Sequence, residues 1–391
     1  MKLWLDAFIL NVSYLKGETI MSNRPAFDPK ELEVAYMKPC GLWGMFDNMG
    51  IPAAKDEPIY NYPISSAENI KLAISGEKPY WIPHVGMAYC ETNPFRPRQL
   101  PDNVAVRLVS DGGPNMEYPE LTAKGWFDLE WVYVPVAGGA TVKPGNPKLE
   151  DMNDWEKVLE WPDLDAIDWE EIGRMNKEYL SHPQLNQFAQ LDGFWERLIS
   201  LMDVEGAAIA MVDEDQKDAL KAFFDRYADF LVEIIERLAK VCKLDSMLIH
   251  DDWGHQNGSF FSLDTCMEMI VPYAKRVTDA AHAHGWVFEI HSCGKNQGLV
   301  PAYIAAGADF WCPQAINDVD YILETYKDSH FFLGMPTSPV APNAPEEEAR
   351  AAARTWFEKY KDLNVFISFM GSNPYFMEEI YKISREEYSK Y

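Results

Sequence analysis

The sequence predicts an α/β protein built on one (β/α)8 barrel, with an N-terminal extension and a hairpin or lid insertion. Short apolar strands alternate with amphipathic helices through the second half of the chain, which is typical of parallel βαβ units. No glycine-rich phosphate loop follows any of these strands, which disfavours a dinucleotide fold. A barrel of roughly 250 residues is ordinary for one domain, so the 391 residues fit one barrel plus excursions. An open doubly wound sheet is the alternative.

The first half of the chain is expected to hold the extension and the start of the barrel. Residues 1–75 are assigned to the extension with a helical segment, and residues 76–391 to the barrel. Residues 80–85 are a candidate first strand. An insertion covers about residues 105–170, within which apolar residues before Gly138 and Gly139 predict a hairpin.

The extreme N-terminus resembles a signal sequence only superficially. Asp6 interrupts its apolar stretch and no small-residue cleavage site follows, so we do not expect one. Met21 is a candidate for the true start of the protein, which would make residues 1–20 an added or mobile segment.

The second half of the chain gives the clearer pattern. Apolar residues from Leu220 to Leu238 recur every three or four positions and predict a long amphipathic helix. Another helix over about 264–284 contains Pro272 and ends at Gly285. Further helices are expected near 299–306 and 346–360, and strands at 187–192, 246–250, 286–291, 308–312, 331–335 and 364–370.

The overall charge and the cysteine pattern exclude several classes of protein. Sixty-one acidic against 35 basic residues give a net charge of −26, which disfavours nucleic acid and anionic membranes as partners. The six cysteines show no close repeated spacing, so we expect reduced thiols and a cytoplasmic protein. No apolar run approaches the ~20 residues of a membrane helix.

Reactive side chains gather where three predicted strands end. His250, Asp251 and Asp252 end one strand, Glu289, His291 and Cys293 end the next, and Cys312 and Gln314 end a third. In a barrel, the carboxyl ends of the strands build the active site. The sequence therefore predicts that these residues share one site.

The sharpest of these features is His291-Ser292-Cys293. Residues two apart in an extended strand point to the same face, so the imidazole and the thiol can hold one ion. Imidazole with thiolate favours zinc among common metals. A buried cysteine beside a hydrogen-bonded histidine is the structural alternative.

Three motifs resemble the uroporphyrinogen decarboxylase superfamily. They are IHDDWGHQ at 249–256, HSCGK at 291–295 and GADFWCPQ at 307–314. They are most similar to the corrinoid-dependent methyltransferase branch, which includes O-demethylases of anaerobic metabolism. The likeness is clearest over residues 185–335.

The resemblance implies the barrel fold and, in thiol-alkylating members, zinc held by His-x-Cys and a later cysteine. His291 and Cys293 match the first two ligands, but the segment around Met370 offers no cysteine. Either another residue is the third ligand or the site has been lost. Cys312 is the expected replacement, because sequential strands are usually neighbours in a barrel. Glu289 and His250 are the alternatives.

The remaining site residues are assigned by position. Asp252 is the expected general acid, with His250 and Glu289 as further catalytic residues, although a turn aspartate is the structural alternative for Asp252. The aromatic side chains could simply belong to the core, and His84 could belong to the core or a lid. The residues expected to bind substrate are Trp253, Gln256, Gln314, His84 and Trp195.

The expected function is therefore zinc-assisted transfer of a methyl group between a small methylated or methoxylated substrate, or a thiol, and the corrinoid (cobalamin) of a partner protein. A metal-independent decarboxylase of the porphyrinogen type is an alternative. Against this alternative, the sequence lacks the arginine-rich motif with which such decarboxylases bind their substrate, although Arg96 and Arg98 could bind a carboxylate. A non-catalytic barrel that binds a ligand or scaffolds a corrinoid complex is another. A homodimer is compatible with the sequence, which does not fix the oligomeric state.

Overall fold

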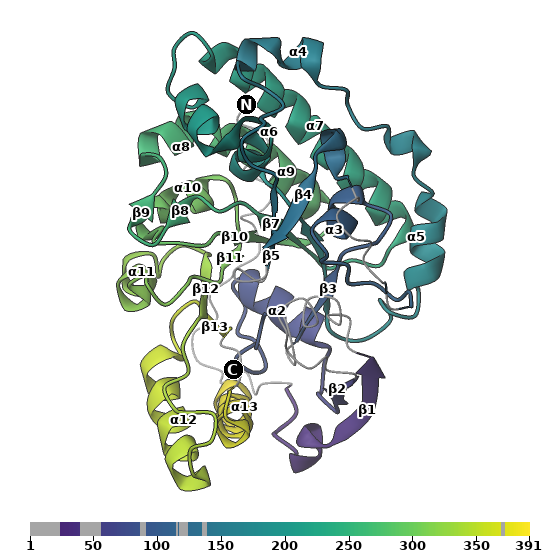
Figure 1. The fold of residues 1–391 in the computed structure, drawn as a ribbon. Helices are drawn as coiled ribbons and strands as arrows, with labels where there is room; N and C mark the ends of the chain where they lie inside the picture. The colour runs from purple at the N-terminus through teal and green to yellow at the C-terminus, as the bar shows by residue number, and fades with distance from the viewer. Residues whose placement is uncertain are drawn as a thin grey trace, which may run out of the picture.

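The centre of the computed structural model is a parallel sheet of seven strands, within the described residues 24–39, 56–86, 91–114, 116, 124–134, 139–368 and 372–391. Its order is β13-β12-β11-β10-β7-β6-β3 (Figure 1). The strands are β3 (Thr92–Phe95), β6 (Leu185–Gln190), β7 (Ser246–His250), β10 (Val287–His291), β11 (Phe310–Trp311), β12 (Phe332–Met335) and β13 (Val365–Ile367). The α/β class with parallel strands is confirmed.

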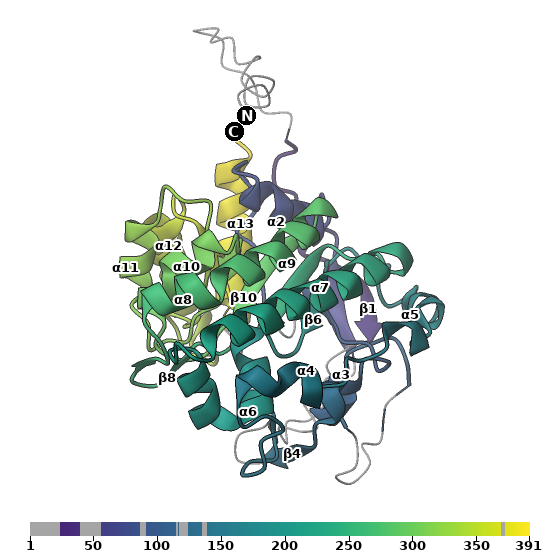
Figure 2. The same cartoon turned by 90° about the horizontal axis from the view of Figure 1, so that it is seen from above.

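Helices connect these strands and cover the outer face of the sheet. They are α3 (Pro101–Ala105), α4 (Trp155–Val158), α5 (Trp169–Asn176), α6 (Phe194–Ala210), α7 (Lys217–Val241), α8 (Leu263–Met269), α9 (Val271–Ala283), α10 (Val300–Ala305), α11 (Val319–Thr325), α12 (Glu346–Tyr360) and α13 (Pro374–Tyr388). In Figure 2, α7 and α9 lie side by side, and the two helices are in contact. None of the described helices combines the length and the apolar character that crossing a bilayer requires.

The segment around His84 lies between the two edges of the sheet, β13 and β3, and forms an isolated bridge there instead of a strand. His84 makes an isolated parallel bridge with Ile367 of β13, and the Val85 amide donates to the Ile367 carbonyl at 2.8 Å. On the other side, the Glu91 amide donates to the His84 carbonyl at 2.8 Å. The expected first strand is therefore a bridge, and β3 is the first strand of the sheet. The described residues form a curled seven-stranded sheet and do not establish a closed eight-stranded barrel.

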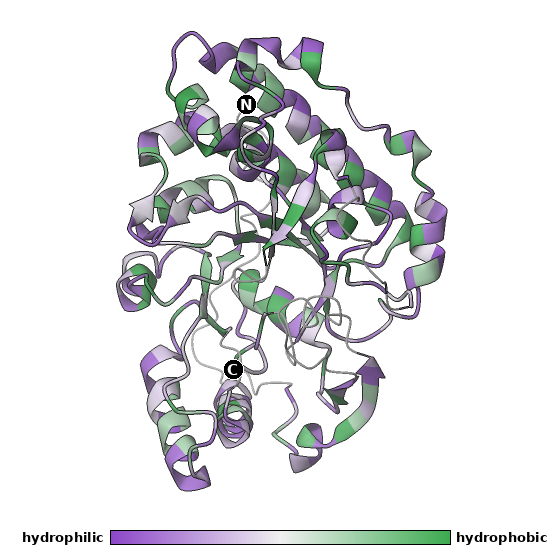
Figure 3. Cartoon of the chain, viewed as in Figure 1, coloured by the Kyte–Doolittle hydropathy of each residue, from purple (hydrophilic) through white to green (hydrophobic). Residues whose placement is uncertain are grey.

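Side chains alternate between two cores along the strands. On β7 and β10, Met247, Ile249, Phe288 and Ile290 belong to the large core against the helices. Each strand places its intervening residues on the inner face of the curled sheet. In Figure 3, apolar and polar residues alternate along the helices, as expected for elements with one buried face. The face predicted from Leu220 to Leu238 is buried in α7.

A second core fills the inner face at the amino ends of the strands. It combines Ala67, Ile70 and Ala73 of α2 (Ser66–Ile74) with residues from widely separated parts of the sheet. Those residues are Val85, Leu185, Val287, Phe310, Phe332 and Phe366. Because strands from β6 to β13 contribute to one small cluster, the sheet must curl around it. The helix α2 packs over this end of the inner face, opposite the carboxyl ends of the strands that carry the reactive residues.

Smaller sheets surround the main one. The antiparallel pair β4 (Trp131–Val134) and β5 (Gly139–Val142) confirms the predicted hairpin, although residues 135–138 of its turn lie outside the described residues. β8 (Gly254–His255) pairs with β9 (Gly258–Ser259). The helix expected over 264–284 is two helices, because Ile270 separates α8 from α9 just before Pro272.

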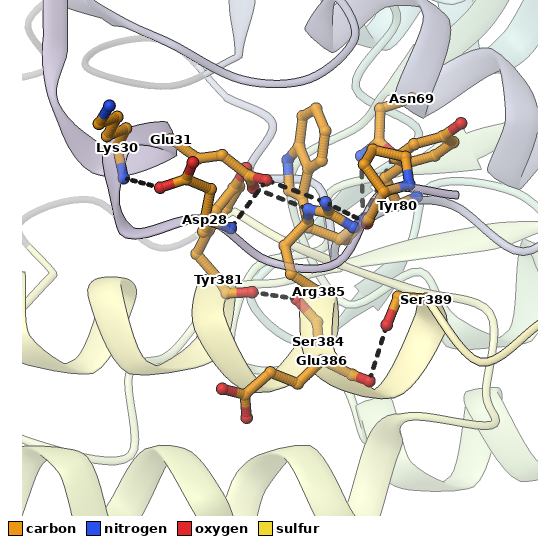
Figure 4. A network of polar contacts seen from close by, with 12 residues as sticks. Asp28, Lys30, Glu31, Asn69, Tyr80, Tyr381, Ser384, Arg385, Glu386 and Ser389 are labelled. Carbon is orange, nitrogen blue, oxygen red and sulfur yellow. Dashed lines mark hydrogen bonds and ion pairs between the residues drawn. The ribbon is translucent and has the colours of Figure 1, made fainter. Parts of the chain in front are cut away.

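The N-terminal segment is joined to the last helix by a buried ion pair. β1 (Val34–Pro39) and β2 (Asp56–Tyr60) form an antiparallel pair after a single helical turn that contains Glu31. Arg385 of α13 donates from Nε to Glu31 Oε2 at 2.8 Å and from Nη2 to Glu31 Oε1 at 3.0 Å (Figure 4). The Tyr381 hydroxyl donates to the same carboxylate at 2.7 Å. The predicted boundary at residue 75 remains a prediction.

Glu91, immediately before β3, should make the stability of the protein depend on pH. Its Oε1 accepts from the Trp81 indole at 2.8 Å and from the His84 amide at 3.1 Å, and burial raises its pKa from 4.5 to about 8. The folded protein therefore keeps a proton that the unfolded chain releases above pH 4.5. This stabilising contribution is present below that pH and is lost as the pH rises toward 8, by about 1.4 kcal/mol per pH unit.

Glu91→Gln keeps an acceptor oxygen but cannot ionise. Urea unfolding between pH 5 and pH 8 should give the variant a smaller fall in the free energy of unfolding than the wild type. Parallel pH profiles for the two proteins would show that Glu91 does not carry this dependence.

Candidate metal centre and its cavity

Two adjacent strands bring the predicted reactive residues together. β7 and β10 pair in parallel with His250 opposite His291, and the Asp251 amide donates to the His291 carbonyl at 2.9 Å. The two imidazole rings lie 4.2 Å apart between centroids. Asp252 follows β7 and Cys293 follows β10, so both lie at the carboxyl edge of the sheet.

Asp252, His291 and Cys293 form a candidate metal centre. One potential ligand atom from each lies within 4.8 Å of the others, and among the described residues this is the group of three with that property. The Cys293 Sγ lies 3.4 Å from His291 Nε2, and the Asp252 Oδ1 lies 3.8 Å from the same nitrogen. The Cys293 amide donates to Asp252 Oδ1 at 2.6 Å, which holds the carboxylate over β10.

These separations fit zinc. Tetrahedral bonds of ~2.0–2.3 Å place neighbouring ligand atoms about 3.3–3.8 Å apart. Nitrogen, sulfur and carboxylate oxygen are all ordinary zinc ligands. Without a metal, burial lowers the pKa of His291, and burial with the nearby Asp252 raises the pKa of Cys293 to about 12. The imidazole and the thiol are then both neutral.

Cys312, the expected third ligand, is not part of this group. Its thiol hydrogen-bonds to the Glu289 carboxyl, and its Sγ lies where a Cβ on Gly334 would be only 2.5 Å away. Because Gly334 of β12 has no side chain, the Cys312 thiol can lie close against that strand. The structure therefore puts Asp252, and not Cys312, beside the His-x-Cys pair. Met370 lies outside the described residues.

Glu289, predicted to be catalytic, lies deeper on the inner face. Its carboxylate accepts from the Gln187 amide nitrogen at 2.7 Å, and burial raises its pKa to about 7. His250 is nearer the edge of the sheet. Arg96 Nη2 lies 3.4 Å from its Nε2, and burial, His291 and Arg96 all lower the pKa of His250.

Asp251 has a structural role that differs from that of Asp252. Its carboxylate accepts from the amides of Phe194, Trp195 and Glu196 at 2.9, 3.3 and 2.9 Å, which satisfies the first N–H groups of α6. This contact joins the carboxyl end of β7 to the helix that follows β6.

Asp251→Ala should cost about 2–4 kcal/mol of folding free energy, because it leaves several buried N–H groups unpaired. Denaturant unfolding at pH 8 would measure the loss, since burial raises the pKa of this carboxyl to about 7. Asp168→Ala is the matched control, because Asp168 caps α5 from an exposed position and should cost about 1 kcal/mol. Equal losses would contradict this role.

A cavity of 730 Å³ adjoins the candidate metal centre. Asp252, His291 and His250 line it on one side, and Trp131 of the β4–β5 hairpin on another. The predicted insertion thus supplies part of the cavity wall. Its other lining residues include Asp192, Glu196, Asp203, Glu205, Val106, Leu108, Leu191 and Ile199.

None of the five residues expected to bind substrate is among the described residues that line this cavity. Trp195 and Trp253 are 0% and 1% exposed and pack in the core against Phe261. Gln314 Oε1 accepts from the Gly294 amide at 2.8 Å and so fixes the loop that holds Cys293. In the structure, Trp195 and Trp253 take part in core packing and Gln314 supports a loop, and the assignment of these residues to substrate binding remains a prediction.

The other two expected residues also lie elsewhere. Gln256 is exposed in the turn between β8 and β9, and His84 lines a second cavity of 530 Å³ together with Glu91 and Tyr381. Sequence reasoning overlooked Asp192 and Glu196 in the main cavity. Both follow the end of β6, so the rule about carboxyl ends of strands could have found them.

Comparisons with known proteins add little to this geometry. No protein-family model matches the chain, and no curated protein matches it. One of the solved structures that match is a B12-independent methionine synthase from Shewanella sp. W3-18-1, with a TM-score of 0.34 and 11% sequence identity. The match covers 60% of this chain and 68% of that one. A likeness of this size defines neither fold nor function, so the functional argument depends on the site.

Proposed function

We propose that this protein is a zinc-dependent enzyme that transfers a methyl group between a small methylated or methoxylated substrate, or a thiol, and the corrinoid of a partner protein. The observation that carries the proposal is the convergence of Asp252, His291 and Cys293 beside a cavity of 730 Å³. Three protein ligands leave a fourth position free, as in catalytic zinc sites. Two of the three ligands line the cavity, so that position can face a substrate.

Bound zinc would supply a Lewis acid that polarises an ether oxygen or lowers the pKa of a thiol. His291, Cys293 and Asp252 would hold it, and Gln314 would keep the Cys293 loop in place. The corrinoid would supply a nucleophile that accepts the methyl group, and the alkoxide left behind by a methyl ether would need a proton. His250 lines the cavity and could exchange this proton when Asp252 is a ligand.

The corrinoid partner is inferred from the resemblance of the three motifs to corrinoid-linked methyltransferases. The strong acidity of the chain, −26 in net charge, favours a protein partner with a basic docking surface.

Two measurements test the proposal. Metal analysis of protein purified under anaerobic conditions should find up to one zinc per chain. The zinc-loaded protein should then move a methyl group from a methyl ether, a methylamine or a methyl thioether to free cob(I)alamin, followed by its visible spectrum. Absence of zinc together with decarboxylation of a porphyrinogen would favour the decarboxylase alternative. Zinc without any methyl transfer, even with a corrinoid protein added, would favour a scaffold.

A further inference from the structure

The most unusual buried group outside the candidate metal centre is Arg96. It follows β3, is 3% exposed, and its backbone is fixed by reciprocal hydrogen bonds with Ser110 at 2.7 and 3.0 Å. Its Nε and Nη1 have no hydrogen-bond partner in the part of the chain that the structure describes. The remaining nitrogen, Nη2, lies 3.4 Å from His250 Nε2.

No described carboxylate lies within ion-pair distance of Arg96. Glu289 acts on the guanidinium electrostatically, but its carboxylate hydrogen-bonds to Gln187 and Cys312. The other deeply buried arginines, Arg197 and Arg385, both have carboxylate partners, at 2.5 and 2.8 Å. A buried guanidinium that keeps two nitrogens without a partner among the described residues is costly, which favours a counterion supplied by a bound molecule.

The surroundings of Arg96 point to the cavity beside the candidate metal centre. The group that it touches, His250, lines that cavity together with Asp252 and His291. Arg96 touches the wall of this cavity through His250, so an anion in the cavity would approach it from that side. Guanidinium N–H groups recognise carboxylates by paired, charge-assisted hydrogen bonds.

We infer that Arg96 binds a carboxylate of the molecule that enters this cavity. The identification of that molecule as the methyl-transfer substrate rests on the proposed function, whereas the binding itself does not. One end of the substrate is then held at Arg96 and the reacting end is presented to the candidate metal centre. This makes small methylated or methoxylated carboxylic acids the substrate class.

The test measures binding to zinc-free, full-length protein by calorimetry, with acetate and benzoate as probes and acetamide and benzamide as uncharged counterparts. Wild type should bind benzoate at least ~10-fold more tightly than benzamide, the range of a hydrogen bond to a charged group. Arg96→Met should abolish this preference. Arg174→Met, which removes an exposed arginine of α5, is the matched control and should keep it.

The melting temperature separates binding from a structural role. Without added anion, Arg96→Met should melt no earlier than wild type, because it removes a buried charge that lacks a partner. Benzoate should raise the melting temperature of the wild type only. If Arg96→Met does not fold, Arg96→Lys should keep the preference for benzoate over benzamide but weaken it.

Several outcomes would overturn the inference. They are equal binding of acids and amides, binding of none of the carboxylates, or benzoate binding that survives in Arg96→Met. Tighter binding of inorganic phosphate than of either carboxylate would assign Arg96 to a different anion and overturn the substrate class. None of these depends on zinc or on methyl transfer, so the proposed function can fail separately.

Discussion

Replacing His291 or Cys293 by alanine should strip the protein of zinc and abolish methyl transfer. Each side chain supplies one of three ligand atoms that lie within 4.8 Å of one another. Two remaining ligands hold zinc poorly, so affinity should fall by more than the ~100-fold that marks residues which only orient a ligand. The rate of methyl transfer should fall by at least ~10³-fold, because a Lewis-acid metal contributes several kcal/mol to stabilising charge in the transition state. Metal analysis after dialysis and transfer to cob(I)alamin would measure the two effects.

The control for this prediction is Cys242→Ala. Cys242 is a half-buried free thiol between the end of α7 and the amino end of β7, at the opposite end of that strand from the candidate metal centre, and its loss should leave the zinc content unchanged. Full activity in metal-free protein, or in either ligand variant, would remove zinc from the mechanism.

Asp252→Ala should have the second largest effect on zinc binding and turnover. It distinguishes the centre seen in the structure, which contains Asp252, from the centre expected from the motifs, which contains Cys312. If Asp252 is the third ligand, zinc affinity should fall at least tenfold and turnover at least ~10²-fold. Asp252→Asn keeps a carbonyl oxygen and the acceptor for the Cys293 amide, so it should retain more zinc than the alanine variant. Competition with a chromogenic chelator would measure the affinities.

Cys312→Ser tests the competing assignment, in which Cys312 is the third zinc ligand. The Cys312 thiol is engaged with Glu289 beside Gly334, so its replacement should leave zinc binding within about twofold of wild type. Loss of zinc in Cys312→Ser, with retention in Asp252→Ala, would restore Cys312 as the ligand. It would also mean that the Cys312 side chain turns when the metal binds.

The regular elements of the second half could be predicted because their signal is local. The buried residues of α7 and of the strands β7, β10 and β12 follow apolar patterns that are visible within about 20 residues of sequence. The first half resisted prediction because its signals compete. Residues 80–85 look like a strand, but in the structure they contribute one bridge, while the polar segment Thr92–Phe95 occupies the edge of the sheet.

The sequence could predict which strand ends carry the site, but not which side chains meet there. A parallel sheet aligns the carboxyl ends of its strands, so placing His250 and His291 together required no knowledge of side-chain packing. Which side chains face one another within that edge depends on neighbours from other strands. Trp195 and Trp253 illustrate the limit, because an aromatic residue beside a motif can equally fill the core.

The sequence by itself determined the α/β class, the edge of the sheet that carries the reactive residues and the His-x-Cys pair, since each follows from a period of two or 3.6 along one segment. Only the tertiary structure decided the rest. It placed Cys312 against Gly334, drew Asp252 over β10 through the Cys293 amide, and left Arg96 buried with no carboxylate partner among the described residues. The physical reason is that ligand geometry and buried charge depend on distances between segments far apart in the chain. Those distances are set by packing, which no local pattern records.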